Sequence, residues 1–481
     1  MNLIQQLDNM FNPRSVAIIG ASNTMGKWGY NILCLLLSDK SREIYAVNKN
    51  EAEVIGRKAY QSVVDVPDNV DLAIITVPFK DVPAAMEDCV RKGVKSVIII
   101  SGGLAETGEE GAQIERETAE IGRRGGIRFI GPNCMGYFNT ASGINTVIFL
   151  PPVTKGPVAL ISQSGNSGQS IITSASEMGL GFSKYVSSGN EADLRFEDYL
   201  EYMAQDDETK LILGYVEGFR EGKCFFERAK EITKVKPIVI VKAGRTQDGA
   251  RAALSHTATL AGSDEISDAA FRQVGVIRVD GIDELIDVSM LLLGQPLPRG
   301  KRVGILSIGG GMAVMAADAV TSQGMELATF SPATMERLDS LLSRRWSHGN
   351  PVDIGGDRFN YECLWPLIED ENVDAVLLIS PTATRSFIDW FAVYAPWLTG
   401  LDKLRKVVEE QDLKELEKVK GMMVKHDKPV VFCSMGITVV REGGVYRYIE
   451  QNHLIPFATP HRAAKALARF IGYSEYLHSL K

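Results

Sequence analysis

Residues 15–37 read SVAIIGASNTMGKWGYNILCLLL. The apolar run Ser15–Ile19 predicts a buried strand, the small residues from Gly20 onward predict a tight turn, and the apolar spacing that follows predicts an amphipathic helix. A strand, a glycine turn and a helix form the first unit of a dinucleotide-type fold, in which the turn and the helix N-terminus suit an anionic ligand. This stretch therefore predicts an α/β protein that opens with a Rossmann-like domain.

The turn is a poor fingerprint for a nicotinamide dinucleotide. Its glycines are Gly20, Gly26 and Gly29 instead of G-x-G-x-x-G, and the second predicted strand, Glu43–Val47, runs towards Lys49 without a terminal carboxylate. NAD usually places its ribose hydroxyls on such a carboxylate, whereas a basic residue favours a phosphorylated nucleotide. A nicotinamide-dependent oxidoreductase is therefore a rival that the turn argues against.

Composition narrows the class of protein. The 481 residues are enough for about three domains of ~100–200 residues each. The formal net charge of −8 argues against a nucleic-acid partner, and no apolar run reaches the ~18 residues of a membrane span. The six cysteines show no C-x-x-C spacing, which predicts no structural metal, no disulfide framework and a reducing, cytoplasmic compartment.

Predicted strands alternate with predicted helices along the chain, and three blocks result. Residues 1–150 form the Rossmann-like domain, and a second domain, 151–296, follows the linker Pro151-Pro152. In the third block, 297–481, RVGILSIGGGMAVMAADAV repeats the plan of PVALISQSGNSGQSIITSASEMG: a strand, a glycine loop and a helix. We therefore expect both later domains to be flavodoxin-like parallel-sheet domains.

Two loops of the second domain are rich in glycine and hydroxyl residues. SQSGNSGQS follows the predicted strand Val158–Ile161, and SSGNEADL follows Phe182–Val186. Such loops open onto helix N-termini and suit phosphate or carboxylate groups, although turn and N-cap roles explain either loop alone. The candidate phosphate- and acyl-binding residues are Ser162, Gln163, Ser164, Gly165, Ser188, Gly189 and Asn190.

A longer loop carries a histidine. Residues 242–268 read KAGRTQDGARAALSHTATLAGSDEISD and follow the predicted strand Pro237–Val241. The neutral imidazole of His256 can attack phosphorus near pH 7, and Glu217, at the end of the strand Leu211–Val216, can accept its N–H and fix its tautomer. The alternatives are a hydrogen-bonded surface histidine and an ordinary acid at a helix start.

The segment SHTATLAGSDEISDAAFRQVGVIRVD resembles the phosphohistidine segment of the NDP-forming acyl-CoA synthetases, the superfamily of succinyl-CoA synthetase and ADP-forming acetate–CoA ligase. The resemblance implies that His256 carries the phosphoryl group, that Glu217 contacts it, and that the two glycine loops hold phosphate and the acyl group. Ala258 and Thr259 replace the Gly-Ser that is usual there. Cys134, within GPNCMG, is expected to be a packed residue instead of a nucleophile.

The first domain is similar to the CoA-binding domain of the same superfamily, through SVAIIGAS, YAVNKN, DLAIITVP, GVKSVIIISGGLAETGEEG and GPNCMGYFNT. The resemblance implies a coenzyme A site. Its candidate residues are Gly20, Ala21, Ser22, Lys27, Gly29, Lys49, Val77, Pro78, Ser101, Gly102 and Asn133.

The third block resembles the α-chain extension of ADP-forming acetate–CoA ligases in GNPVDIGGD, DAVLLISP and KPVVFCSMG. The resemblance therefore implies the α subunit of an ADP-forming acyl-CoA synthetase, which makes acid, CoA and ATP from acyl-CoA, phosphate and ADP through acyl phosphate and a phosphohistidine. Nothing resembles an ATP-grasp domain, so we expect a separate ATP-grasp β subunit, in an α2β2 complex, to bind ADP or ATP and Mg²⁺. A non-catalytic CoA-binding regulatory protein is the alternative, and the acyl group stays open.

Residues 384–426 are longer than is usual in that extension. Their segment LDKLRKVVEEQDLKELEKVKGMM predicts a charged amphipathic helix. We expect a solvated or subunit-facing insertion there.

Overall fold

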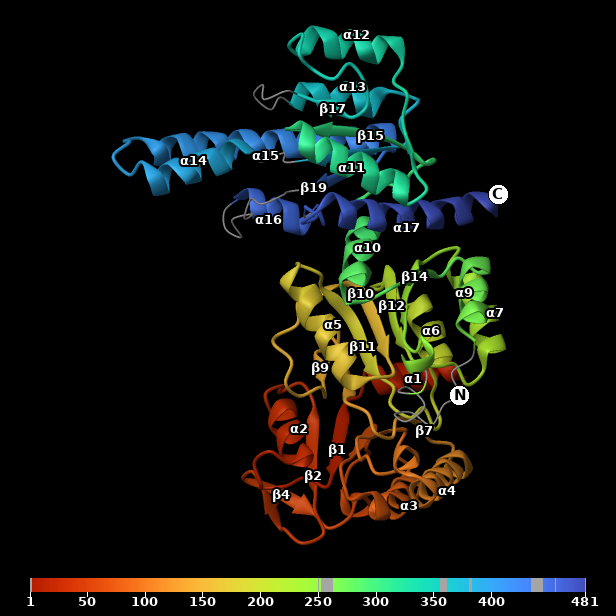
Figure 1. The fold of residues 1–481 in the computed structure, drawn as a ribbon. Coiled ribbons are helices and arrows are strands. Elements are labelled where there is room, and N and C mark those ends of the chain that lie inside the picture. The colour runs from red at the N-terminus through yellow and green to blue at the C-terminus, as the bar shows by residue number, and fades with distance from the viewer. Residues whose placement is uncertain are drawn as a thin grey trace. The chain divides into compact units, whose positions relative to one another are not determined.

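The computed structural model describes residues 2–249, 251, 263–354, 361–379, 383–433, 444–454 and 456–480. The chain divides into two compact units, Met1–Asp280 and Gly281–Lys481, which are described separately (Figure 1). The predicted α/β class with mainly parallel sheets is confirmed. Among the described helices, none is both long and apolar enough to cross a membrane.

The first sheet of unit 1 has the order β3-β4-β2-β1-β5-β6-β7, and only the β3–β4 pair is antiparallel. Its strands are β1 (Ser15–Ile19), β2 (Glu43–Val47), β3 (Glu53–Val54), β4 (Arg57–Tyr60), β5 (Leu72–Ile75), β6 (Ser96–Ile99) and β7 (Arg128–Ile130). Its helices are α1 (Leu3–Phe11), α2 (Trp28–Leu37), α3 (Val82–Lys92) and α4 (Glu109–Gly125), with 3₁₀ turns at Val63–Asp65, Phe79–Asp81 and Ala105–Thr107.

Strand β1 is buried along its whole length because both faces of this sheet are covered. Successive side chains point to opposite faces of a strand. Val16 and Ile18 accordingly join one hydrophobic cluster, whereas Ala17 and Ile19 join another. The continuous apolar run that marked β1 in the sequence is thus explained by two separate cores.

The second sheet of unit 1 has the order β14-β13-β12-β10-β11-β8-β9. Its strands are β8 (Gly136–Asn139), β9 (Ile144–Asn145), β10 (Lys155–Ser162), β11 (Phe182–Ser187), β12 (Leu211–Val216), β13 (Ile238–Lys242) and β14 (Ile277–Val279). Its helices are α5 (Gly165–Glu177), α6 (Phe196–Gln205), α7 (Gly222–Ile232) and α9 (Asp264–Gln273). Strands β8 and β9 are antiparallel additions that precede the domain limit predicted at residue 150, and the limits at 150 and 296 stay predictions.

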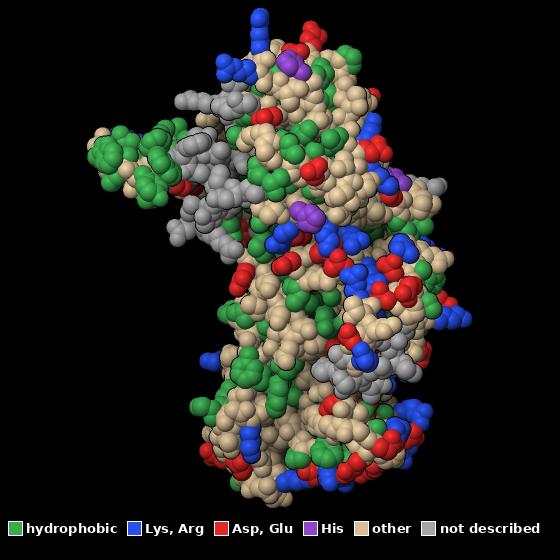
Figure 2. Space-filling view, viewed as in Figure 1, with side chains coloured by type: hydrophobic (Ala, Val, Ile, Leu, Met, Phe, Trp, Pro, Cys, Tyr) green, Lys and Arg blue, Asp and Glu red, His purple; other side chains and the backbone are tan. Residues whose placement is uncertain are grey.

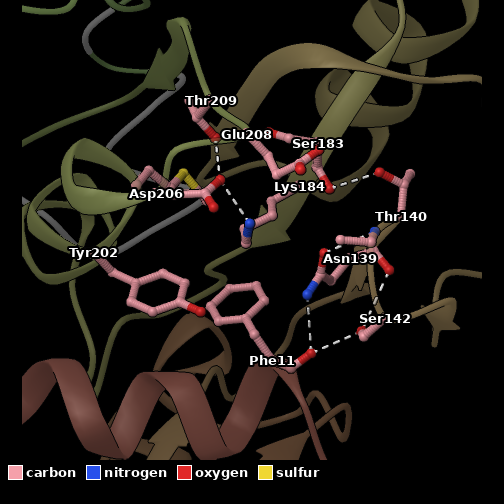
Figure 3. Close-up of polar contacts among 12 residues, drawn as sticks. Phe11, Asn139, Thr140, Ser142, Ser183, Lys184, Tyr202, Asp206, Glu208 and Thr209 are labelled. Carbon is pink, nitrogen blue, oxygen red and sulfur yellow. Dashed lines mark hydrogen bonds and ion pairs between the residues drawn. The ribbon is translucent and has the colours of Figure 1, made fainter.

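Helix α1 is fastened to the second sheet by polar and aromatic contacts (Figure 3). The Asn139 amide Nδ2 donates to the carbonyl oxygen of Phe11 at 3.2 Å, and the Phe11 ring stacks on Tyr202 at 4.9 Å. Nearby, the buried Lys184 ammonium lies 2.6 Å from an Asp206 carboxylate oxygen. Helix α1 therefore packs in the core of the second sheet as well as in the core of the first sheet.

Unit 2 contains a third, parallel sheet of order β16-β15-β18-β19, with β17 paired to β15. Its strands are β15 (Arg302–Ser307), β16 (Glu326–Leu327), β17 (Val352–Asp353), β18 (Ala375–Ile379) and β19 (Val430–Cys433). Its helices are α10 (Ile282–Gly294), α11 (Gly310–Ser322), α12 (Pro332–Leu341), α13 (Leu364–Glu369), α14 (Ala383–Tyr394), α15 (Leu401–His426), α16 (Gly444–Gln451) and α17 (Pro460–Ser479), with a 3₁₀ turn at Tyr361–Cys363.

The first and last helices of unit 2, α10 and α17, pack against each other. The Arg462 guanidinium donates to both carboxylate oxygens of Asp287 at 2.8 Å, and Glu284 pairs with Lys465 and Arg469 at 3.0 and 2.9 Å. Both carboxylates are nearly buried. Bidentate, charge-assisted contacts of this kind set the register of two helices as well as adding stability.

Candidate functional site

A cavity of about 670 Å³ opens at the carboxyl ends of β1, β2, β5 and β6. This edge is where open parallel sheets usually bind ligands. Every residue predicted for coenzyme A lines it except Asn133: Gly20, Ala21, Ser22, Lys27, Gly29, Lys49, Val77, Pro78, Ser101 and Gly102. The sequence pattern therefore gathers these candidates in one place, and Asn133 lies behind the lining, next to Gly102.

The glycine turn after β1 has the geometry of an anion site. Gly20 has a φ of +98°, and a Cβ atom on Gly29 would lie 2.0 Å from the Gly20 carbonyl oxygen, so both positions require glycine. Asn48 fixes the turn, because its amide donates to the Ala21 carbonyl oxygen at 2.7 Å. The side chain of Lys27, the residue before α2, makes no cap hydrogen bond, which leaves amide N–H groups at the helix start for a ligand.

Charges of both signs line the cavity. Lys27 and Lys49 are exposed, and the Lys49 ammonium lies 3.6 Å from an Asp81 carboxylate oxygen. Asp88 also lines the cavity and accepts a hydrogen bond from the Ser62 hydroxyl at 2.6 Å. The cavity thus suits a ligand that carries anionic groups together with hydrogen-bond donors.

A second group of candidates meets at the side chain of Gln163. Its Oε1 accepts the backbone N–H groups of Glu217 at 2.6 Å and of Gly218 at 3.1 Å. Its Nε2 donates to the Gly218 carbonyl oxygen at 2.8 Å and to Glu191 Oε2 at 3.1 Å. One amide therefore joins the loops that follow β10, β11 and β12, and we call Gln163 and these partners the Gln163 clasp.

Glu191 was not singled out from the sequence, although it lies inside SSGNEADL. It is buried, and its Oε1 accepts the Ser188 hydroxyl at 2.7 Å. Burial raises the pKa of this carboxyl to about 7, in spite of the hydrogen bonds that favour its charged form. The available signal was the acid itself, which directly follows Gly189-Asn190 in this loop.

The remaining loop residues are held by local contacts. Ser164 caps α5, since its hydroxyl accepts the Ser167 N–H at 3.3 Å, so the N-cap interpretation holds for this residue. The Ser162 carbonyl oxygen accepts the Ser188 N–H at 2.9 Å, which places the two loops side by side. Gly189 has a φ of +62°, and any Cβ there would lie 2.2 Å from the Pro132 carbonyl oxygen.

Asn190 connects this region with the cavity. Its amide Nδ2 donates to Glu106 at 2.7 Å and to Glu115 at 2.8 Å, and its Oδ1 accepts from Asn133 at 3.3 Å. A Cβ atom on Gly102, which lines the cavity, would lie 3.0 Å from the Asn133 side-chain oxygen. Sequence reasoning missed both acids, because only the fold brings them to Asn190.

Glu217 itself is nearly buried at the end of β12. The buried Lys242 ammonium donates to the Glu217 carbonyl oxygen at 2.7 Å and to that of Ala243 at 2.6 Å, and desolvation lowers its pKa. Lys242 is the last residue of β13, where the histidine loop begins. His256 itself lies outside the described residues.

Cys134 is fully packed, as expected. Its thiol donates to the Ile99 carbonyl oxygen at 3.3 Å, and burial raises its pKa to about 12. A thiol that stays protonated is no nucleophile. Across the described residues, no group of three or more His, Cys, Asp or Glu side chains is arranged to hold a metal ion.

Two family models match the chain, one over the part that holds the first sheet and one over most of the part that holds the second. Residues 14–140 match a family model described as a CoA binding domain, and residues 155–292 match the succinyl-CoA ligase like flavodoxin domain. The fold and site thus define a protein that joins a CoA-binding domain to a ligase-type flavodoxin domain.

Relatives identify the family within that class. The α subunit of the ADP-forming acetate–CoA ligase II of Pyrococcus furiosus is 44% identical over 383 residues, which are 79% of this chain and 83% of that protein. ADP-forming acetate–CoA ligase I of Archaeoglobus fulgidus is 40% identical over 98% of this chain, and the match spans 64% of that longer protein. The chain belongs to the family of ADP-forming acetate–CoA ligases.

Solved structures show the same fold. A protein of Pyrococcus horikoshii OT3 is 36% identical, with a TM-score of 0.78 over 98% of this chain and 99% of that one. Acetyl-coenzyme A synthetase 1 of Ca. Korarchaeum cryptofilum, solved with phosphate and ADP, is 30% identical, with a TM-score of 0.83 over 98% and 97% of the two chains.

Proposed function

We propose that this chain is the α subunit of an ADP-forming acyl-CoA synthetase. Acyl-CoA and phosphate give acyl phosphate and CoA, the phosphoryl group passes to His256 with release of the acid, and phospho-His256 delivers it to ADP. A covalent carrier divides one difficult transfer into easier steps. The observation that carries the proposal is that the predicted CoA residues line one cavity, while the predicted phosphate and acyl loops meet at the Gln163 clasp in the same unit.

Coenzyme A is assigned to the cavity of the first sheet. Its phosphates fit the glycine turn, the start of α2 and the exposed Lys27 and Lys49, because backbone N–H groups and ammonium groups both stabilise phosphate. The carboxylates that line the same cavity offer acceptors for hydroxyl and amine donors of the ligand.

Glu217 is assigned to orient and stabilise the imidazole of His256. A carboxylate that accepts one ring N–H leaves the other nitrogen free to attack phosphorus, and it stabilises the cation that forms. Gln163 and Lys242 act as positioning residues, since they bind the backbone of Glu217 from two sides.

A second protein component completes the reaction. We assign ADP and Mg²⁺ to an ATP-grasp β subunit in an α2β2 complex. The support is that two relatives, at 44% and 43% identity, are named subunit alpha. Relatives named for acetate favour a small carboxylic acid as the substrate. A cytoplasmic location stays a prediction from the cysteine usage.

The experiment is a phosphorylation assay with acetyl-CoA and phosphate, read by intact mass and peptide mapping. The wild type should gain one acid-labile phosphoryl group on His256, and His256→Ala should gain none. Glu217→Gln should phosphorylate more slowly with CoA affinity nearly unchanged. A phosphate on a serine, or full turnover by His256→Ala with the partner chain, would overturn the proposal.

A calorimetric comparison tests the CoA assignment separately. CoA should bind more tightly than dephospho-CoA, because a charge-assisted hydrogen bond to the extra phosphate contributes roughly 1.5–3 kcal/mol, or about 10- to 100-fold. Lys27→Ala or Lys49→Ala should reduce that preference. Equal affinities for the two ligands would place the phosphate elsewhere.

A further inference from the structure

The side chain of Asn190 uses both of its amide protons and its oxygen in hydrogen bonds. Nδ2 donates to Glu106 Oε2 at 2.7 Å and to Glu115 Oε2 at 2.8 Å, and Oδ1 accepts from Asn133 at 3.3 Å. The backbone N–H of Asn190 donates to the Pro132 carbonyl oxygen at 2.9 Å. Asn190 is buried, with 6% of its surface exposed. This residue therefore serves the site through the neighbours that it holds in place.

Glu106 links Asn190 to the wall of the cavity. Its Oε2 accepts from Asn190, and its Oε1 accepts the backbone N–H of Gly103 at 2.6 Å. The preceding residue, Gly102, lines the cavity, and a Cβ atom there would lie 3.2 Å from Glu106 Oε1 and 3.0 Å from the Asn133 side-chain oxygen. One carboxylate therefore joins the loop that follows β6 to the Asn190 amide.

The second acceptor of the Asn190 amide is a buried carboxylate. Figure 2 shows acidic and basic side chains together on the outer surface over α3 and α4, and the other charged side chains of α4 are all exposed. Glu115 is only 6% exposed, and it also accepts the Ala105 N–H at 3.3 Å. A buried carboxylate requires such donors. An aspartate in place of Asn190 would remove both donated protons and add a third carboxylate.

The next residue, Glu191, is bound to a different set of loops. Its carboxylate accepts from Ser188 at 2.7 Å and from Gln163 at 3.1 Å, within the Gln163 clasp. Gly189 and Glu191 have φ values of +62° and +55°. A non-glycine residue in this left-handed region costs about 1–3 kcal/mol and persists only where its surroundings fix it. Residues 190–191, which we call the 190–191 turn, therefore hold the cavity wall with one side chain and the Gln163 clasp with the other.

The proposed first step needs these two places at a fixed separation. A phosphate oxygen bonds to the carbonyl carbon of acyl-CoA, the C–S bond breaks, and the leaving thiolate takes up the proton that phosphate gives up. Reacting atoms have to approach to ~3–3.5 Å, and a misplacement of ~1 Å can slow a reaction about 100-fold. CoA is assigned to the cavity and phosphate to the loops of the second sheet, so the structure that joins them sets this separation.

We infer that Asn190 is a positioning residue for this first step, because the 190–191 turn fixes the cavity wall relative to the Gln163 clasp. The inference rests on the proposed function and names a residue on which its first step depends. The later transfer, from acyl phosphate to His256, no longer involves the thioester. An Asn190 variant should therefore be impaired with one phosphoryl source and normal with another.

The test compares two phosphoryl sources for His256 in the purified full-length chain, with intact mass as the readout. Acetyl-CoA with phosphate requires the first step, whereas acetyl phosphate bypasses it. Asn190→Asp should be phosphorylated at least about tenfold more slowly from acetyl-CoA and phosphate, because two charge-assisted hydrogen bonds are lost and a repelling charge is gained. From acetyl phosphate, its rate should stay within about twofold of the wild type.

An exchange of donor and acceptor tests the hydrogen bond itself. Glu106→Gln alone places amide protons against the Asn190 amide and should show the same selective loss. In the double variant E106Q/N190D the new glutamine amide donates to the new aspartate, so the rate should return to within about threefold of the wild type. Burial raises the pKa of the Glu115 carboxyl, which favours the protonated form that an aspartate at this position accepts from. Because Glu106 is only half-buried, its variant decides the question if Asn190→Asp does not fold.

Asn139→Asp is the matched control. It changes another buried amide of unit 1, which donates to the Phe11 carbonyl oxygen at 3.2 Å, so any loss of stability should affect both phosphoryl sources equally. Equal slowing of Asn190→Asp with both sources, no slowing with either, or a double variant no faster than Asn190→Asp would overturn the inference. A wild type that gains no phosphate on His256 from either source would overturn the proposed function and the inference with it.

Discussion

Replacing Gln163 by leucine removes the amide of the Gln163 clasp while keeping a side chain of similar size. The N–H groups of Glu217 and Gly218 lose their acceptor, and Glu191 loses one of its donors. A polar group left unsatisfied in a buried site costs about 1–3 kcal/mol, and Gln163 is only partly buried, so we expect unit 1 to lose roughly 3 kcal/mol of unfolding free energy.

The functional consequence should be selective. The backbone that carries Glu217 loses its anchor, so His256 phosphorylation should slow at least about tenfold, as expected when a positioning contact worth ~1.4 kcal/mol is lost. CoA affinity should stay within about twofold of wild type, well below the ~1.4 kcal/mol of a tenfold change, because Gln163 does not line the CoA cavity.

Urea unfolding, intact-mass phosphorylation kinetics and CoA calorimetry would measure these three quantities. The matched control is Gln169→Leu on α5, which removes a single hydrogen bond of 2.7 Å to the Ile148 carbonyl oxygen and should cost only about 1 kcal/mol. Equal stability losses in the two variants, or a parallel loss of CoA affinity in Gln163→Leu, would refute the reasoning.

Three further predictions concern other parts of the chain. Gly29→Ala should weaken CoA binding by at least about tenfold, because its Cβ atom would lie 2.0 Å from a carbonyl oxygen of the turn. The control Gly222→Ala has open space around its Cβ atom and should bind CoA like the wild type. Equal CoA affinities of the two variants in calorimetry would contradict this prediction. Burial raises the pKa of the Glu191 carboxyl from its ordinary value of 4.5 to about 7, so this group stays protonated up to a higher pH in the folded state than in the unfolded state. The free energy of unfolding should therefore fall by up to ~3 kcal/mol as the pH rises from about 4.5 to about 7. Urea titrations of Glu191→Gln should lack this dependence on pH. The same pH dependence in the variant and the wild type would refute the role given to Glu191. Asp287→Asn should destabilise unit 2 by about 2 kcal/mol, because Arg462 loses its charged partner, and a melting curve unchanged from wild type would show that the pair contributes nothing.

The sequence predicted most accurately those features that depend on short-range patterns. Ser15–Ile19 and the glycines after it identify a strand and a turn, and these become β1 and the wall of the cavity. The charged segment that predicted a helix becomes α15. Local spacing was sufficient in these cases because neighbouring residues in the chain form the element.

Features that depend on distant contacts escaped prediction. The resemblance assigned Asn133 to the CoA site, and that assignment stays a prediction; the hydrogen bond that its amide donates to the Asn190 side-chain oxygen was not foreseen. Glu115 lies on α4 in an ordinary charged helix sequence, and only the fold shows that it is buried beside Asn190.

Helices α10 and α17 are joined by the pairs of Asp287 with Arg462 and of Glu284 with Lys465 and Arg469. Separating the two helices would leave nearly buried carboxylates without their partners, which is strongly unfavourable. Local opening of α17 alone is therefore costly, and we expect the backbone amides around Arg462 to exchange with solvent only when α10 opens as well.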